Sequence, residues 1–177
     1  MYSYRERDIV IRKGFIGETE PMFKKFLDRG GLWVMAQGLL LALVAASPFW
    51  MPTVLPWTGP AHHIAGGCLI TLGSGLLLAG VLKLGSSLTA LPHPRDDASL
   101  RTDGIYRHVR HPIYGGLIVL VAGYCLVMPS PLELLFALAT LFFFDQKARV
   151  EERWLARRYP SYPEYAGRTR KFFPGIY

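Results

Sequence analysis

Charged residues are missing from two long stretches of this 177-residue chain. Residues 30–82 contain no Lys, Arg, Asp or Glu, and Glu133 is the only such residue within 111–144. Soluble domains spread charge over every element, so this segregation excludes a water-soluble globule. The hydrophobic content of 51% excludes a disordered tail. The pattern instead indicates an integral membrane protein.

Cysteine is also scarce. Cys68 and Cys125 both lie inside apolar runs, which excludes a disulfide-stapled module and makes them small packing residues. No His and Cys residues have the spacing of metal ligands, so we expect no metal. The net charge of +7 would suit a nucleic-acid partner, but the Lys and Arg residues flank apolar runs, as in membrane proteins. We therefore expect a lipid bilayer as partner, and we expect no nucleic-acid partner.

Apolar segments predict an all-α membrane bundle of about four transmembrane helices. They lie at about 32–51, 61–82, 113–128 and 132–158. The last has only 13 apolar residues, about 20 Å of helix, before Asp145 and Lys147, so it must continue into a cytosolic extension that ends before Tyr159. Charges at that depth either face a protein cavity or snorkel out of a thinned bilayer, and the sequence leaves both open.

The positive residues predict the topology. Seven of the 20 Lys and Arg residues lie in 1–31, five in the loop 83–110 and eight from residue 145 onward, whereas the connections 52–60 and 129–131 have none. The positive-inside rule then puts both termini and the loop 83–110 in the cytoplasm, in a multi-pass protein of the cell (inner) membrane. We expect a cytosolic or interfacial segment at 1–31 and one membrane domain over 32–177, with a tail at 159–177.

The third predicted span begins with Arg110-His111-Pro112-Ile113-Tyr114-Gly115-Gly116. Pro112 suits the first helical position, which puts Arg110 and His111 at a helix N-terminus, where anions are favoured. An interfacial anchor for the membrane surface is the alternative interpretation.

The extension of the fourth span carries Glu151-Glu152-Arg153-Trp154-Leu155, followed by an aromatic and basic tail. One interpretation is a carboxylate offered to a cationic ligand. The other is a solvated pair between Lys147 and Glu151, one helical turn apart.

Together, these motifs resemble one superfamily. The order RHPxYxG, a short helical hairpin, an EExxL box, tyrosines three residues apart and a closing Arg and Pro resembles the isoprenylcysteine carboxyl methyltransferases, with the phosphatidylethanolamine N-methyltransferases as relatives. The resemblance covers about 84–177, and the segments 91–97 and 102–107 are similar to the family's segment before the first box. It departs from the family at Gly104-Ile105-Tyr106, where Gly-Pro-Tyr is common, and at Tyr159-Pro160, where Phe-Gly is common.

This resemblance implies a membrane enzyme that uses S-adenosyl-L-methionine in a cytosolic pocket and acts on a carboxyl, thiol or amine group of a lipophilic small molecule or lipid. The cofactor-binding residues that it implies are His111, Pro112, Tyr114, Gly115, Gly116, Glu151 and Glu152, with Gly73 and Gly75 of the second span. One glutamate would bind the cofactor and the other would hold an arginine or lysine.

Catalytic candidates follow from the same resemblance. An acidic headgroup of the substrate would be neutralised by an arginine, and the sequence leaves the choice open among Arg110, Arg149, Arg168 and Arg170. An amine acceptor needs a base, for which Tyr106, His111 and Glu152 are the candidates. Two other functions stay open: an NADPH-dependent membrane reductase that resembles the C-terminal part of the steroid 5-alpha-reductases, and a non-catalytic membrane adaptor.

Overall fold

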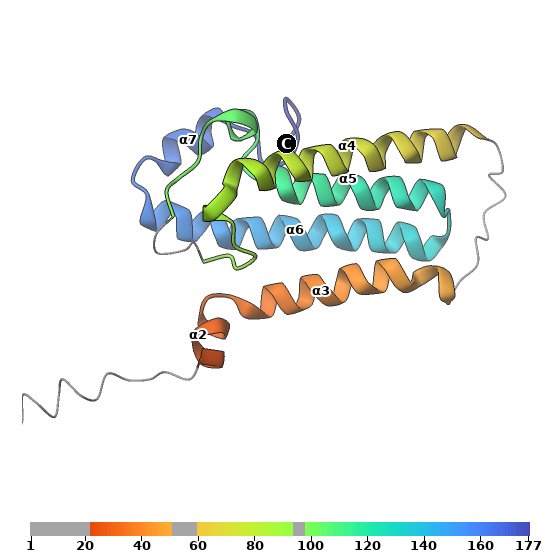
Figure 1. Ribbon diagram of the computed structural model, residues 1–177, viewed down its shortest axis with the longest axis horizontal. Helices are drawn as coiled ribbons and strands as arrows, with labels where there is room; N and C mark the ends of the chain where they lie inside the picture. The colour runs from red at the N-terminus through yellow and green to blue at the C-terminus, as the bar shows by residue number, and fades with distance from the viewer. Residues whose placement is uncertain (1–21, 51–59, 94–97) are drawn as a thin grey trace, which may run out of the picture.

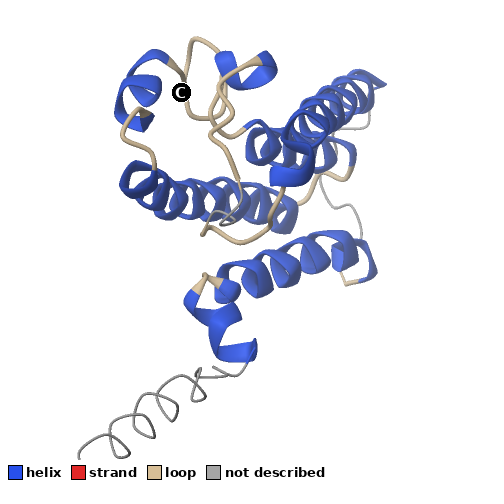
Figure 2. Ribbon diagram, turned by 60° about the vertical axis from the view of Figure 1, so that its left-hand side comes forward, coloured by secondary structure: helices blue, strands red, loops and turns tan. Residues whose placement is uncertain are grey.

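Long antiparallel helices form the body of the protein in the computed structural model, which describes residues 22–50, 60–93 and 98–177 (Figure 1). The long helices are α3 (Gly31–Ala46), α4 (Pro60–Leu84), α5 (Pro112–Val127) and α6 (Pro131–Arg158). Short helices lie at α2 (Met22–Asp28) and α7 (Tyr162–Arg168), with 3₁₀ turns at Ser47–Phe49, Gly85–Ser87 and Gly104–Arg107. The described residues form no β-strand, which confirms the all-α prediction (Figure 2).

Some predicted segments lie partly outside the described residues. Residues 1–21 belong to the N-terminal segment, residue 51 to the first span and residues 52–59 to the connection that follows it. Residues 94–97 belong to the loop 83–110 and to the segment 91–97 within it.

Two helical stretches have the length and composition of a membrane span, Gly31–Phe49 and Pro60–Ser87. Little of either stretch is buried, and large apolar side chains such as Leu39 and Leu72 are exposed. The apolar helix α5 has 16 residues, about 24 Å, which is shorter than a bilayer core. A membrane protein is supported, while the number of four spans and the side of the termini stay predictions.

Helix boundaries follow from local chemistry. The Ser130 hydroxyl accepts a hydrogen bond from the Glu133 amide at 3.1 Å and caps the start of α6. The helix then runs unbroken for 28 residues, as the sequence predicts, and ends where Tyr159 precedes a proline. The first span differs from its prediction, because α3 ends at Ala46 and a 3₁₀ turn follows around Pro48, which has no N–H to donate.

Glycines allow α4 and α5 to pack closely. Gly66, Gly73 and Gly80 recur every seven residues on α4, and all three are buried against α5. A Cβ atom on Gly73 would lie 2.6 Å from the amide nitrogen of Leu120. Small residues at such positions let two helix backbones approach, which is how apolar helices associate without a hydrophobic driving force.

A small core joins α5, α6 and the C-terminal tail. Ile118, Phe144, Ala148 and Phe172 are buried together, with Tyr114 packed against them. Helix α3 joins this body through the side that faces α6, where the ring of Trp33 lies 5.5 Å from that of Phe143. The N-terminal turn of α5 is thereby held between α6 and the tail.

Candidate active site

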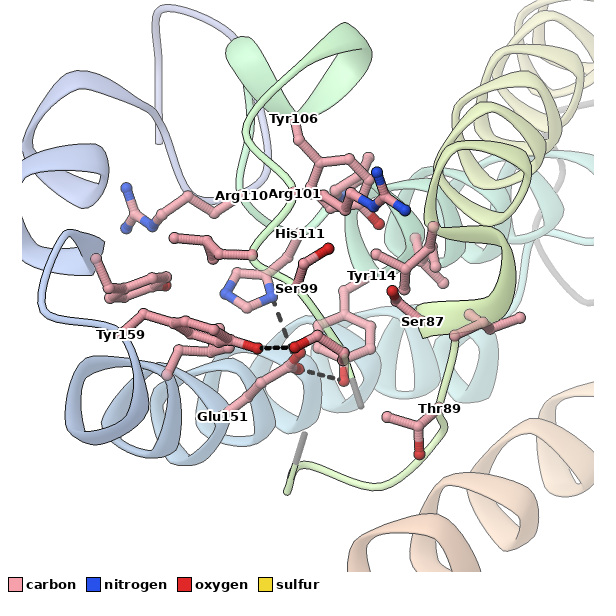
Figure 3. A pocket seen from close by; sticks show the side chains of 18 of the residues that line it. Ser87, Thr89, Ser99, Arg101, Tyr106, Arg110, His111, Tyr114, Glu151 and Tyr159 are labelled. Atoms are coloured by element: carbon pink, nitrogen blue, oxygen red, sulfur yellow. Dashed lines mark hydrogen bonds and ion pairs between the residues drawn. The ribbon is translucent and has the colours of Figure 1, made fainter. Parts of the chain in front are cut away.

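A cavity of about 430 Å³ lies where the first turn of α5 faces the second half of α6 (Figure 3). It is lined from every long helix, from residues 84–90 and 98–101, and from tyrosines of the tail. Its volume falls in the range of small-molecule pockets, about 300–1,000 Å³. Both sequence motifs meet at this cavity, through Arg110, His111, Pro112 and Tyr114 on one side and Glu151 on the other.

The tail holds the first motif in place. The amides of Arg110 and His111 donate to the carbonyls of Arg170 and Lys171 at 2.8 and 3.0 Å, and α5 starts directly afterwards at Pro112. The side chain of Lys171 forms an ion pair of 2.5 Å with Asp145 of α6. The tail therefore packs against the first motif and against α6. A tail that only lay at the membrane surface would not need these contacts.

Glu152 ties α6 to the first motif. Its Oε1 accepts from Nε of Arg110 at 2.8 Å and lies 3.1 Å from Nε2 of His111. Nη1 of Arg110 also donates to the carbonyls of Ala166 and Thr169. Burial disfavours the carboxylate, but the hydrogen bonds and charge of His111 and Arg110 outweigh it and lower the pKa of Glu152 to about 2. Glu152 is thus an ionised partner of Arg110.

Glu151, in contrast, lines the cavity. The Tyr114 hydroxyl donates to its Oε2 at 2.7 Å, and Nδ1 of His111 lies 3.8 Å from the same oxygen (Figure 3). The His111 ring stacks almost parallel on the Tyr114 ring, with centroids 5.4 Å apart. The carboxylate of Glu151 therefore lines the cavity beside the polar edges of these two stacked rings.

Four tyrosines close the cavity on the side of the tail. The Tyr165 hydroxyl donates to the carbonyl of Tyr106, and the Tyr159 hydroxyl to that of Ala98, each at 2.6 Å. The Tyr162 hydroxyl is buried and has no hydrogen-bond partner among the described residues. Burial raises the pKa of Tyr106 and of Tyr162, so both phenols are neutral at physiological pH.

The four predicted cofactor glycines are not among the residues that line the cavity. Gly73 and Gly116 face each other across α4 and α5, since a Cβ on Gly116 would lie 2.7 Å from the carbonyl oxygen of Gly73. A Cβ on Gly115 would lie 2.9 Å from the carbonyl oxygen of Phe172, and Gly75 faces open space. Three of these glycines therefore occupy packing positions that hold α5 in place.

Among the lining residues to which sequence reasoning gave no role in the site are Gln37, Arg101 and Lys147. Lys147 was expected as a charge at membrane depth or as a solvated partner of Glu151. Lys147 is fully buried, so it faces the protein and does not snorkel. The signal for Gln37 was present: it is the only residue of α3 that is neither apolar nor glycine.

A family model and individual relatives agree with the motifs. The phospholipid methyltransferase model matches residues 61–162. The nickel-cobalt-cadmium resistance protein NccN of Alcaligenes xylosoxydans xylosoxydans is 32% identical over 84% of this chain and 65% of its own length. The protein-S-isoprenylcysteine O-methyltransferase of Dictyostelium discoideum is 34% identical over 52% of this chain and 41% of its own. The chain thus spans less than two thirds of these curated relatives.

The fold is shared with a solved membrane enzyme. The structure of a eukaryotic intramembrane Ras methyltransferase, isoprenylcysteine carboxyl methyltransferase, superposes with a TM-score of 0.58 and 23% identity, over 83% of this chain and 53% of that one. The family match covers more than half of the chain and includes both helices that carry the motifs. This protein belongs to the phospholipid methyltransferase family, within the superfamily that also contains the isoprenylcysteine carboxyl methyltransferases.

Proposed function

We propose that this protein is an integral membrane methyltransferase that uses S-adenosyl-L-methionine to methylate a lipophilic acceptor at the cytosolic face. The observation that carries the proposal is the carboxylate of Glu151, held by Tyr114 in a cavity with aromatic walls. A half-buried carboxylate that forms no ion pair with a described Lys or Arg suits a cationic ligand, and the cofactor is a sulfonium with an ammonium group.

The residues present fit such a cofactor. The cavity volume of about 430 Å³ suits a molecule of that size. The buried hydroxyl of Tyr162, which has no partner among the described residues, offers a hydrogen bond to a polar group of the ligand. Tyr106, Tyr159 and Tyr165 provide flat apolar surfaces on which a purine can lie.

When bound, the cofactor supplies an electrophilic methyl group. The acceptor atom would take this methyl group, and the electron pair of the broken carbon–sulfur bond would remain on sulfur. The protein has to align the two reactants and exclude water, which contributes as much as about 7–11 kcal/mol to lowering the barrier. Glu151, Tyr114 and His111 form the face of the cavity that would bind the ammonium group of the cofactor and so orient its methyl group.

The candidate bases favour an acceptor that ionises by itself. The pKa of about 2 makes the carboxylate of Glu152 a weak base, and the raised pKa of Tyr106 keeps its phenol protonated. The Tyr106 hydroxyl also lies 3.4 Å from the carbonyl oxygen of Gly80, to which it donates. A carboxyl acceptor is ionised at neutral pH without help from these groups, and a thiol ionises by itself in small part, whereas an amine would depend on His111.

Arg110 has a positioning role in this proposal. Its guanidinium already bonds Glu152 and two carbonyls, so its charge is compensated within the protein. It links α5, α6 and α7 and so fixes the distance between the two motifs. We propose that the ion pair between Arg110 and Glu152 keeps His111 and Glu151 facing each other.

The test is ligand binding by the purified protein in a neutral detergent. We expect S-adenosylhomocysteine to bind, NADP not to bind, and Glu151→Gln to weaken binding about ten- to a hundred-fold, since a charge-assisted hydrogen bond contributes about 1.5–3 kcal/mol. The matched control is Glu164→Gln, an exposed glutamate of α7. Binding of NADP alone would indicate the reductase, and binding of neither ligand would indicate the adaptor.

The acceptor is identified by product analysis. The protein is incubated with a lipid extract and methyl-labelled S-adenosyl-L-methionine, and the labelled lipid is identified by mass spectrometry. Label in a lipophilic carboxylate or thiol supports the argument from the bases, and label in an amine contradicts it.

A further inference from the structure

A buried lysine lies at the edge of the cavity, on the side of α3. Lys147 has no exposed surface, although it comes from the part of α6 that follows the apolar run. Its Nζ donates to Oε1 of Gln37 at 2.5 Å and to the carbonyl of Ala90 at 2.9 Å, and it lies 5.2 Å from the ring centroid of Tyr114. Three separate segments of the chain therefore meet at this ammonium group.

No ion pair among the described residues compensates the charge of Lys147. Both hydrogen-bond acceptors are neutral, and none of the described carboxylates forms an ion pair with it. Glu151 lies one turn further along α6, but its Oε2 is bonded to Tyr114. An ammonium group has three N–H donors, and two of them are used here. Burying an unpaired cation is costly unless an anion reaches it.

Three other cations near the site differ from Lys147, because each has a carboxylate partner. Arg110 is paired with Glu152, and Lys171 with Asp145, each within the protein. Lys83 is paired with Asp103 at the surface. Of these residues, Lys83 and Lys171 do not line the cavity, whereas Lys147 does. Lys147 differs from these three residues because it is a fully buried cation with neutral hydrogen-bond partners at a ligand-sized cavity. Arg101 also lines the cavity, but it is only partly buried.

We propose that Lys147, oriented by Gln37, forms a subsite that binds an anionic group, a carboxylate or a phosphate, of a molecule in the cavity. The proposal rests on the proposed function for the cavity itself. The anion has two sources, the carboxylate of the amino-acid part of the cofactor or the headgroup of the lipophilic acceptor. Gln37 is a positioning residue, because its carbonyl oxygen directs the Nζ and leaves the third N–H for the ligand.

This subsite also explains the one amide in α3. Residues 31–46 of that helix are otherwise apolar or glycine, and the helix lies outside the part of the chain that matches the family model. A polar side chain in an apolar helix is costly unless it is satisfied. The side-chain oxygen of Gln37 accepts its hydrogen bond from Lys147, and no other described side chain bonds it. In this proposal α3 therefore helps to select the ligand, in addition to anchoring the protein in the membrane.

The experiment compares ligands that differ only in the anion. The first pair is S-adenosylhomocysteine and 5′-methylthioadenosine, which lacks the carboxylate. The second pair is decanoate and decanamide, which test a lipophilic headgroup. Affinities are measured at neutral pH in a neutral detergent for the wild type, Lys147→Met, Gln37→Glu and Arg157→Gln. Arg157 is the control, because it is an exposed cation of the same helix outside the cavity.

Gln37→Glu is the sharper variant, since it preserves the shape of the side chain. A carboxylate at this position would form an ion pair with Lys147 and neutralise its charge, so anionic groups of a ligand would lose their partner. We expect both Lys147→Met and Gln37→Glu to weaken one anionic ligand about ten- to a hundred-fold and to leave its neutral analogue unchanged. Loss in the first pair assigns the anion to the cofactor, and loss in the second assigns it to the acceptor.

Two results would overturn the proposed subsite. One is that the wild type binds the anionic ligand no more tightly than its neutral analogue in either pair. The other is a folded Gln37→Glu variant that keeps every preference of the wild type. The proposed function fails by a different result, namely that the wild type binds no S-adenosylhomocysteine. In that case a preference for decanoate that Gln37→Glu abolishes still supports the subsite.

Discussion

Replacing Glu152 by Gln tests how strongly the two motifs are held together. The side chain keeps its shape but loses the charge that bonds Arg110 and His111. A pKa lowered from 4.5 to about 2 corresponds to roughly 3 kcal/mol of stabilisation at about 1.4 kcal/mol per pH unit. Because about a fifth of the side chain is exposed, solvent screening reduces our expectation to about 2 kcal/mol at neutral pH.

The pH dependence gives the sign of the effect. A carboxyl group whose pKa is depressed by folding stabilises the protein fully above its unfolded pKa, and this stabilisation is lost as the pH falls through the folded value. The difference between wild type and Glu152→Gln should therefore be constant above about pH 4.5 and shrink toward pH 2.

The assay is reversible unfolding in mixed micelles, monitored by tryptophan fluorescence at several pH values. The control is Glu164→Gln, which removes an exposed glutamate paired with Arg168 and should leave the unfolding free energy nearly unchanged. The reasoning is refuted if Glu152→Gln is as stable as the wild type at neutral pH. It is also refuted if the difference does not change between pH 6 and pH 3.

The remaining predictions concern topology, the cavity and helix packing. In a cysteine-free background, a cysteine at Thr58 should react with an impermeant thiol reagent in intact cells and one at Ser99 should not; the opposite pattern contradicts the charge argument. Tyr114→Phe should weaken S-adenosylhomocysteine binding several-fold in titration calorimetry, because the cavity carboxylate loses its donor, and unchanged affinity counts against that role. Gly73→Val should lower the unfolding midpoint, because its Cβ would meet the α5 backbone, whereas Gly75→Val faces open space; equal midpoints would refute the packing argument.

Much of the fold could be predicted because its signals are local. The apolar runs and their bounding prolines predicted segments at 61–82, 113–128 and 132–158, and α4, α5 and α6 agree with them within two residues at each end. A helix satisfies its own backbone, so its extent depends on the sequence within it and on the residues that cap it. The continuation of α6 past Asp145 followed from the same reasoning, since 13 apolar residues are too few to span a bilayer.

The division of labour between the two glutamates could not be predicted. Residues 151 and 152 point about 100° apart on a helix, so only one can face a given ligand, but which one depends on how α6 is rotated against α5. The tertiary structure turns Glu151 to the cavity and Glu152 to Arg110. That rotation is set by packing of the Phe144 and Ala148 face against Ile118 and Phe172.

The sequence by itself determined the helical class, the bounds of α4, α5 and α6, and the two motifs, because hydropathy and capping act over a few neighbouring residues. Only the tertiary structure decided what each polar group faces. Gln37 and Lys147 are 110 positions apart and meet because α3 packs on α6. Gly73 and Gly116 meet for the same kind of reason, as α4 and α5 approach to backbone contact. Contacts between distant segments depend on the fit of whole helix faces, which no short pattern encodes.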